Sequence, residues 1–173
     1  DRVVGTLERC RKPTIAAIAG ACTGGGGALA AACDLRIAAA NARFGFPVAR
    51  TLGNCLSAGN YARLASLVGV GRAKAMIFTA RLVEAEEAKS VGLVSEVLPD
   101  HAALMARAEA LAKHVASLAP LTLRATKEAL HRLMPRIPTE DGRDIILMCY
   151  MSKDFQEGMD AFLNKRTPQW KGE

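Results

Sequence analysis

Aromatic side chains are scarce in this sequence, at 5% of 173 residues with a single tryptophan. Lysine and arginine exceed the acidic residues by six, but they are dispersed, with no basic stripe and no aromatic residues between them. Nucleic-acid binding needs such a stripe, so we expect no nucleic-acid partner, although a small polyphosphate ligand is compatible with the charge. No apolar run is long enough to cross a bilayer, so we also expect no membrane partner.

Cysteines at metal-binding or redox spacing are also missing. The five cysteines are odd in number and scattered, without CxxC or Cys/His spacing: Cys10, Cys22, Cys33, Cys55 and Cys149. The sequence opens on DRVVGTLERCRKP, which does not resemble a secretory leader. We therefore expect reduced, buried thiols in a cytoplasmic protein without a metal site, and a redox or metal role is the less favoured alternative.

The sequence does contain four consecutive glycines, at 24–27 within GACTGGGGALAAACD. A phosphate-binding P-loop needs Lys and Ser or Thr after its last glycine, but Ala28 and Leu29 follow here. The dinucleotide pattern G-x-G-x-x-A does fit residues 25–30, yet its acid about twenty residues later is missing. No carboxylate lies between Asp34 and Glu84. A nicotinamide or flavin site is therefore disfavoured, and we expect no separate cofactor.

Two interpretations of the glycines stay open. They precede a predicted helix, whose first N–H groups lack internal partners and lie at its positive end. Such donors can stabilise an oxygen that gains negative charge during a reaction. Alternatively, the glycines only allow a helix and a strand to pack closely.

The remaining pattern predicts an α/β fold. We expect a helix end over 3–12, a buried strand over 14–19, a helix over 28–33, and strands over 34–39 and 43–46. From residue 57 the pattern is mainly helical, with helices over 57–68, 72–78 and 84–91, a C-terminal cap at Gly92, and a strand over 93–98. Three final helices carry apolar stripes typical of a core or a subunit interface, with a hinge at 135–138.

Several linked motifs together resemble the crotonase superfamily, which is the enoyl-CoA hydratase/isomerase family. They are KPTIAAIAG (12–20), GGGG (24–27), ACDLRIA (32–38), ARFGFP (42–47), AEEAKSVGLVSEV (85–97), and the stretch from Ala119-Pro120 to KEAL (127–130). The resemblance covers essentially the whole chain, in order. It also implies that the chain lacks the N-terminal third of the family.

The resemblance implies a ββα spiral core over 1–98 and a helical region over 99–173 for trimerisation and CoA contact, giving a homotrimer or a dimer of trimers. It implies an acyl-CoA substrate, with CoA entering as part of that substrate. The thioester oxygen would rest on two backbone N–H groups, one of them from Gly25, with Gly24 beside it. Phe162 and Lys165 resemble residues that reach the CoA of a neighbouring subunit, and plain core and a solvated helix face are the respective alternatives.

The family's two catalytic glutamates are replaced in this sequence. Ala28 and Val48 occupy their positions, and neither can transfer a proton. Asn54 and Ser57 follow and could orient a water or a substrate carbonyl, but we favour a turn with Ser57 as a helix N-cap. We expect an acyl-CoA thioester enzyme, nominally an enoyl-CoA hydratase/isomerase. The alternatives are another enolate chemistry such as decarboxylation or C–C cleavage, or a non-catalytic acyl-CoA-binding scaffold subunit.

Overall fold

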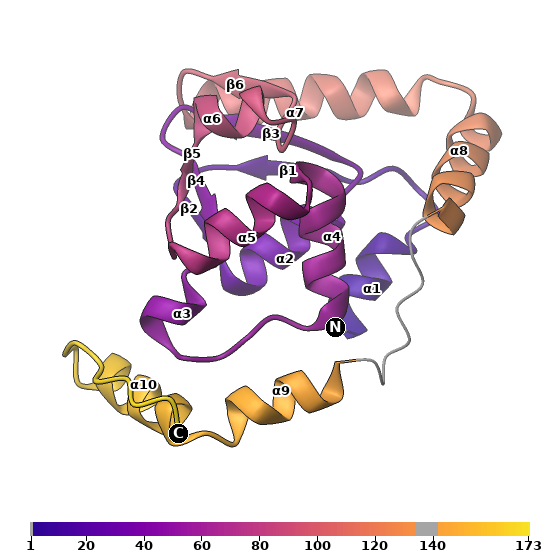
Figure 1. Cartoon of the computed structure of the whole chain (residues 1–173). Helices are drawn as coiled ribbons and strands as arrows, with labels where there is room; N and C mark the ends of the chain where they lie inside the picture. Colours follow the sequence, from indigo (N-terminus) through magenta and orange to yellow (C-terminus); the bar gives the residue numbers. More distant parts are fainter. Residues whose placement is uncertain (1, 134–141) are drawn as a thin grey trace.

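Short strands of small and β-branched residues lie at the centre of the molecule, and helices surround them (Figure 1). The computed structural model describes residues 2–133 and 142–173. Its strands are β1 (Ile15–Ile18), β2 (Ala21–Thr23), β3 (Leu35–Ala39), β4 (Arg43–Gly45), β5 (Val83–Glu84) and β6 (Glu96–Leu98). Its helices are α1 (Arg2–Glu8), α2 (Gly24–Ala32), α3 (Val48–Thr51), α4 (Ala58–Val68), α5 (Val70–Phe78), α6 (Ala85–Ser90), α7 (His101–Ala116), α8 (Pro120–Leu133), α9 (Arg143–Tyr150) and α10 (Lys153–Leu163).

The strands form two small sheets, and successive strands along the chain alternate between them at first. In the first sheet, β3 lies between β1 and β6, and all three strands are parallel. In the second, β2 pairs in parallel with β4, which pairs antiparallel with β5. The consecutive strands β1 and β2 thus pair with the consecutive strands β3 and β4, with α2 between the two pairs. This arrangement is one ββα turn of a spiral, and it confirms the expected α/β fold.

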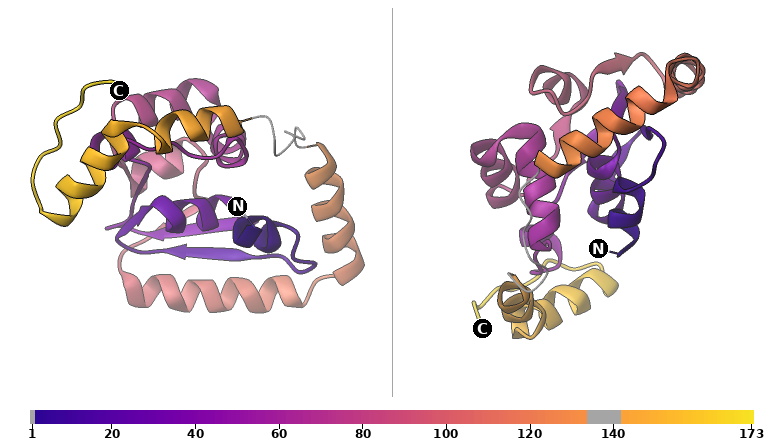
Figure 2. Two further views of the ribbon diagram at one scale, coloured as in Figure 1. Left: turned by 90° about the horizontal axis from the view of Figure 1, so that it is seen from below. Right: turned by 90° about the vertical axis from the view of Figure 1, so that its right-hand side faces the viewer.

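Helices cover both faces of the first sheet (Figure 2). Helix α2 contacts β1 from one side, and α7 runs along β1 and β3 on the other. Leu104 of α7 is fully buried against Ile37 and Ala39 of β3. The first part of the apolar stripe predicted for this helix, from Leu104 to Leu111, therefore belongs to the core, whereas Leu118 at its end is 42% exposed.

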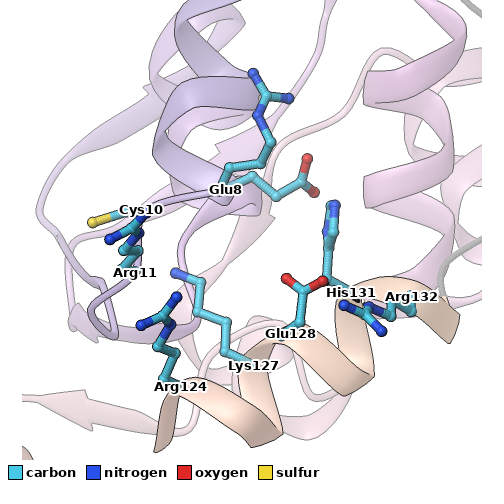
Figure 3. Close-up of a pocket in the computed structure, with 9 residues that line it drawn as sticks. Glu8, Cys10, Arg11, Arg124, Lys127, Glu128, His131 and Arg132 are labelled. Carbon is cyan, nitrogen blue, oxygen red and sulfur yellow. Dashed lines mark hydrogen bonds and ion pairs between the residues drawn. The ribbon is translucent and has the colours of Figure 1, made fainter. Parts of the chain in front are cut away.

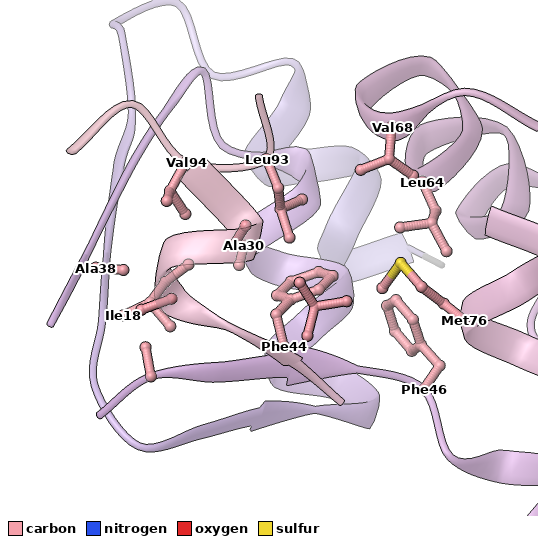
Figure 4. Close-up of a cluster of buried hydrophobic side chains, with 14 of the residues drawn as sticks. Ile18, Ala30, Ala38, Phe44, Phe46, Leu64, Val68, Met76, Leu93 and Val94 are labelled. Carbon is pink, nitrogen blue, oxygen red and sulfur yellow. The ribbon is translucent and has the colours of Figure 1, made fainter. Parts of the chain in front are cut away.

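The main hydrophobic core lies between the second sheet, α2, α4 and α5 (Figure 4). The rings of Phe44 and Phe46 pack edge to face, with centroids 5.6 Å apart and planes at 89°. Leu64 and Met76 complete this part of the core and are also almost fully buried. Each such side chain contributes about 1.5–3 kcal/mol through burial. Phe46, which follows β4, belongs to this cluster and also lies against Gly27, so the cluster holds the end of β4 beside α2.

The last helices lie outside this core. Helix α8 has no buried residue, and α9 and α10 extend as an arm (Figure 1). Lys127 ties α8 to the core, because its Nζ donates to a carboxylate oxygen of Asp34 at 2.6 Å. The arm meets the core where α10 passes the end of α3, and Gly158 allows this approach. A Cβ at Gly158 would lie 2.5 Å from the carbonyl oxygen of Leu52.

Several expectations need correction. The helix predicted over 28–33 begins at Gly24, because its packing overrides the weak helix propensity of glycine. The strand β2 and the helix α9 were not predicted, so the chain ends in four helices rather than three within the described residues. In α8, Leu130 is 60% exposed, so a core role for its stripe is wrong in this chain, and an interface role stays a prediction. The hinge predicted at 135–138 falls outside the described residues.

Candidate functional site

The N-terminus of α2 is an open feature on the surface of the ββα turn. The chain leaves β2, passes Thr23 in an extended conformation, and enters α2 at Gly24. The side chain of Thr23 makes no capping hydrogen bond to the helix. The first N–H groups of a helix have no partner within it, so those of α2 can bind an external acceptor.

The four glycines of α2 differ in why they are glycine. Gly24 has φ +53°, a left-handed conformation that side chains disfavour. Gly27 is required by packing, because a Cβ there would lie 2.9 Å from Cζ of Phe46. Gly25 and Gly26 are exposed, have no positive φ, and leave open space where a Cβ would stand. Close helix–strand packing, the simpler interpretation, therefore explains Gly27 but neither of these two.

The electrostatics of α2 are asymmetric. At its C-terminal end the half-buried guanidinium of Arg36 donates to the carbonyl oxygens of Cys33 and Ala30, and also to that of Leu93 at 2.9 Å. Burial lowers the pKa of Arg36. A cation at this end complements the helix dipole, whereas no acidic residue lies in the first turn at the other end. No acidic side chain of the first turn therefore occupies the positive end of α2, which is open to an external anionic oxygen. Sequence reasoning missed Arg36, although a basic residue just after a predicted helix is a usable signal.

Cys22, two residues before the glycine loop, has a half-buried thiol. The expectation of buried cysteines is wrong, because Cys10 is exposed and the other four are only partly buried. Burial raises the pKa of Cys22 to about 11, so this group stays neutral at physiological pH. Its backbone carbonyl oxygen lies 3.4 Å from the position of a Cβ at Gly27. Cys22 therefore adds no charge to the open helix end.

Ala28 and Val48, which stand where the resemblance predicts the two catalytic glutamates, are both buried. Ala28 is 5% exposed and packs with Val4 and Ala32 between α1 and α2. Val48 is 8% exposed at the start of α3. Neither side chain carries a proton-transfer group, and both contribute apolar burial.

The other predicted polar residues, Asn54 and Ser57, contact the later helices. The Nδ2 atom of Asn54 donates to the hydroxyl of Tyr150 in α9 at 3.1 Å, and its Oδ1 is buried without a hydrogen-bond partner among the described residues. Oγ of Ser57 accepts from the N–H of Asn60 at 3.4 Å as the N-cap of α4. The favoured capping interpretation of Ser57 fits this contact, and a role in catalysis for either residue stays a prediction. Tyr150, which the sequence pattern did not single out, is the unexpected partner.

Phe162 and Lys165 lie at the far end of the arm. Phe162 is 64% exposed at the end of α10, so a core position for it is wrong in this chain. Lys165 follows the helix with φ +52°, a conformation that costs a non-glycine residue about 1–2 kcal/mol. Both side chains are available to a second molecule, and their contact with CoA stays a prediction.

The described residues contain neither a metal-ligand cluster nor a membrane-spanning helix. In 2–133 and 142–173, no three or more His, Cys, Asp or Glu side chains are grouped so as to hold a metal ion. Across the same ranges, no helix has the length and apolar character needed to cross a membrane.

Comparisons with known proteins agree on one family. The family model described as enoyl-CoA hydratase/isomerase matches residues 2–173. Among curated relatives, the short-chain-enoyl-CoA hydratase of Clostridium acetobutylicum is 39% identical over 169 residues, which cover 96% of this chain and 64% of the relative. The mitochondrial methylglutaconyl-CoA hydratase of Mus musculus is 38% identical over 178 residues, which cover 99% of this chain and 56% of the relative.

Solved structures are similar over nearly the whole chain. Methylmalonyl-CoA decarboxylase in complex with 2-nitronate-propionyl-CoA has a TM-score of 0.90 at 29% identity, covering 99% of this chain and 67% of that protein. The enoyl-CoA hydratase of Bacillus anthracis has a TM-score of 0.72 at 40% identity, with the same two coverages. The chain thus spans a little over half to about two thirds of the length of these relatives. The matching family model, the curated hydratases and the shared spiral fold together show that this chain belongs to the enoyl-CoA hydratase/isomerase family, the crotonase superfamily.

Proposed function

We propose that the protein acts on acyl-CoA thioesters and that the backbone N–H of Gly25 donates to the thioester oxygen. One observation carries this proposal. Gly25 and Gly26 are exposed at the positive end of α2, and neither backbone conformation nor packing requires glycine there. A small residue at such a point lets a substrate oxygen approach the helix donors closely. As the α-carbon becomes an enolate, negative charge grows on that oxygen, and fixed donors stabilise it more than they stabilise the ground state.

The replaced glutamates favour some enolate reactions over others. Hydration needs groups that activate a water and move protons at adjacent carbons, and the buried Ala28 and Val48 cannot supply them. Decarboxylation of a malonyl-type thioester differs, because the departing CO2 leaves its electron pair on the α-carbon. The enolate then forms without a base, and stabilising its oxygen is the main task left to the protein. The similarity in fold to methylmalonyl-CoA decarboxylase supports this choice, while hydration, which the curated relatives suggest, is the nominal activity.

The test removes the backbone N–H of Gly25 and compares the result with a variant that keeps it. Gly25→Pro deletes the N–H in the first helical turn, where proline is tolerated, and Gly25→Ala keeps the N–H as a matched control. Wild type and both variants are incubated with malonyl-type and enoyl-CoA thioesters, and products are followed by mass spectrometry. We expect Gly25→Pro to lose about 100-fold or more of the turnover, the cost of one oxyanion donor. Gly25→Ala keeps the donor and should lose less, because its methyl group only narrows the space through which the substrate oxygen approaches. Equal turnover by the two variants would refute the assignment of Gly25.

A second candidate function follows from the same buried pair. With Ala28 and Val48 both apolar, the fold could bind acyl-CoA as a scaffold subunit without turning it over. Calorimetric binding of acyl-CoA with no product from any thioester of the panel would support this candidate. Product formation would exclude it, and loss of turnover in Asn54→Ala or Ser57→Ala would place catalytic groups after Val48.

We further propose that the protein assembles as a homotrimer or a dimer of trimers through its C-terminal helices. Large apolar side chains are exposed there: Leu121, Leu130, Leu133, Met148, Met151, Phe162 and Leu163. Covering such a surface is favourable in proportion to the apolar area removed from water. Light scattering after size exclusion measures the assembly. Binding of acyl-CoA by Phe162→Ala and Lys165→Ala then tests whether the arm reaches the ligand of a neighbouring subunit.

A further inference from the structure

A charged cavity lies between the end of α1 and α8, on elements that the proposed acyl-CoA site does not use. Its volume is about 550 Å³, within the usual range for small-molecule sites. Figure 3 shows Arg124 and Lys127 of α8 directed toward Arg11, which follows α1. More than a hundred residues separate the two sides of the cavity in sequence, and the fold brings their positive charges together.

The acidic residues at this cavity are already engaged. Glu8 forms an ion pair with Arg63 at 2.6 Å, outside the cavity lining. Glu128 forms one with Arg132, its neighbour on the next turn of α8, at 2.7 Å. Arg132 is the main cause of the lowered pKa of Glu128 and Arg124 contributes, so this carboxylate partly compensates Arg124 as well. Two carboxylates still do not balance the five Arg and Lys side chains of the lining.

Three arginines of the cavity lining have no ion-pair partner. Within residues 2–133 and 142–173, Arg9, Arg11 and Arg124 form no salt bridge, whereas Lys127 is paired with Asp34. Like charges gathered on one wall repel one another and raise the free energy of the compact state. A bound multivalent anion would relieve this repulsion, so the electrostatic energy of the cavity favours anion binding.

We propose that this cavity is a binding site for a phosphate ester or a pyrophosphate group with at least two negative charges, separate from the acyl-CoA site. Arginine presents several donors in a fixed fork that matches phosphate oxygens, which makes three unpaired arginines a phosphate-recognising set. The described lining residues include no Phe, Tyr or Trp, so the cavity offers no large aromatic surface on which a nucleobase would stack. The phosphate is therefore the recognised group. None of Gly24, Gly25, Phe162 or Lys165 lines the cavity.

The test measures binding of inorganic pyrophosphate to the full chain by isothermal titration calorimetry at physiological salt. The double variant Arg11→Gln/Arg124→Gln removes two exposed guanidinium groups, and Arg72→Gln, exposed on α5, is a control that removes a charge at a distant surface. We expect saturable 1:1 binding to the wild type and a weakening on the order of 100-fold in the double variant, from two lost charge-assisted hydrogen bonds. The Arg72→Gln control should stay within about twofold of the wild type.

Two results would overturn the proposal. One is the absence of saturable binding to the wild type, or an affinity that the double variant shares, with circular dichroism showing that the variant is folded. The other is a matching loss of acyl-CoA binding in the double variant Arg11→Gln/Arg124→Gln, which would make the cavity part of the substrate site. The proposal is also separable from the proposed function, because Gly25→Pro should bind pyrophosphate as tightly as the wild type.

Discussion

A single methyl group should affect the stability of this fold differently at Gly25 and at Gly27, two glycines of the same helix. Gly27→Ala places a Cβ 2.9 Å from Cζ and 3.0 Å from Cε1 of Phe46. That ring cannot move aside easily, because it is 1% exposed and locked edge to face against Phe44. Gly25→Ala adds the same methyl group to the same helix but meets no atom within 4 Å.

The matched pair isolates the packing contribution. Alanine stabilises a helix interior by about 1 kcal/mol relative to glycine, and this gain enters both variants to a similar degree. Forcing an extra methyl group into a close-packed core costs about 1–3 kcal/mol. Gly27→Ala should therefore be less stable than Gly25→Ala by about 1–3 kcal/mol, although the propensity gain can hide much of the loss relative to wild type.

Urea and thermal unfolding, followed by circular dichroism at several probe wavelengths, measure this difference. For a chain of this size, each kcal/mol corresponds to about 2–4 °C in Tm. Equal midpoints for the two variants would refute the claim that Gly27 is fixed by packing. The distinction between packing glycines and ligand-facing glycines would then fail, and with it the main support for placing a substrate at Gly25.

Three further predictions concern other parts of the chain. Arg166 holds the pKa of Glu157 down to about 2, so the stabilisation from this carboxylate is complete above its unfolded pKa of about 4.3 and is lost as pH falls through about 2. Glu157→Gln should therefore lower the stability at pH 6, and denaturant midpoints should show this difference shrinking toward zero as the pH falls through about 2. Burial raises the pKa of Cys22 to about 11, so alkylation of this thiol by iodoacetamide at pH 8 should be at least about 100-fold slower than that of a free cysteine. Peptide mass spectrometry measures the rate, and a rate comparable to that of a free cysteine would contradict the burial. Gly158→Ala places a Cβ 2.5 Å from the carbonyl oxygen of Leu52 and should release the α10 arm. Limited proteolysis should then cleave the arm several times faster while the core resists. An unchanged cleavage rate would show that the arm is not held at this contact.

The strands that sequence alone predicts well are those with dense β-branched or apolar character. The run over 14–19 and the run over 34–39 contain β1 and β3 within one or two residues, because buried parallel strands have a distinctive composition. The three-residue strand β2 was missed, since Ala-Cys-Thr has no periodicity to detect. Its pairing with β4 arises only once the spiral brings the two together, which is information that a local window does not contain.

The sequence predicts some residues of the candidate site better than others. The glycine loop at Gly25 stood out because four glycines in succession are costly unless the backbone requires them. Which of those glycines faces a ligand could not be read from the sequence, since it depends on where Phe46 lies in three dimensions. The contact of Asn54 with Tyr150 joins residues about a hundred positions apart, so no local spacing pointed to it.

The two ends of α2 give the strongest physical reason to connect fold and chemistry. At the C-terminal end Arg36 satisfies helix carbonyls, and the neighbouring Asp34 is held by Lys127 and by the N–H and hydroxyl of Thr14. The carbonyl end is thereby fixed and paired within the chain, while the N–H end carries no capping side chain and no acid. A missing cap does not by itself mark α2, because α5 also begins without a side-chain cap or an acid in its first turn, and its Gly71 is exposed with open space where a Cβ would stand. What sets α2 apart is its paired C-terminal end together with two adjacent open glycines, Gly25 and Gly26. Under the proposed function, a substrate oxygen takes the place of the cap at these glycines.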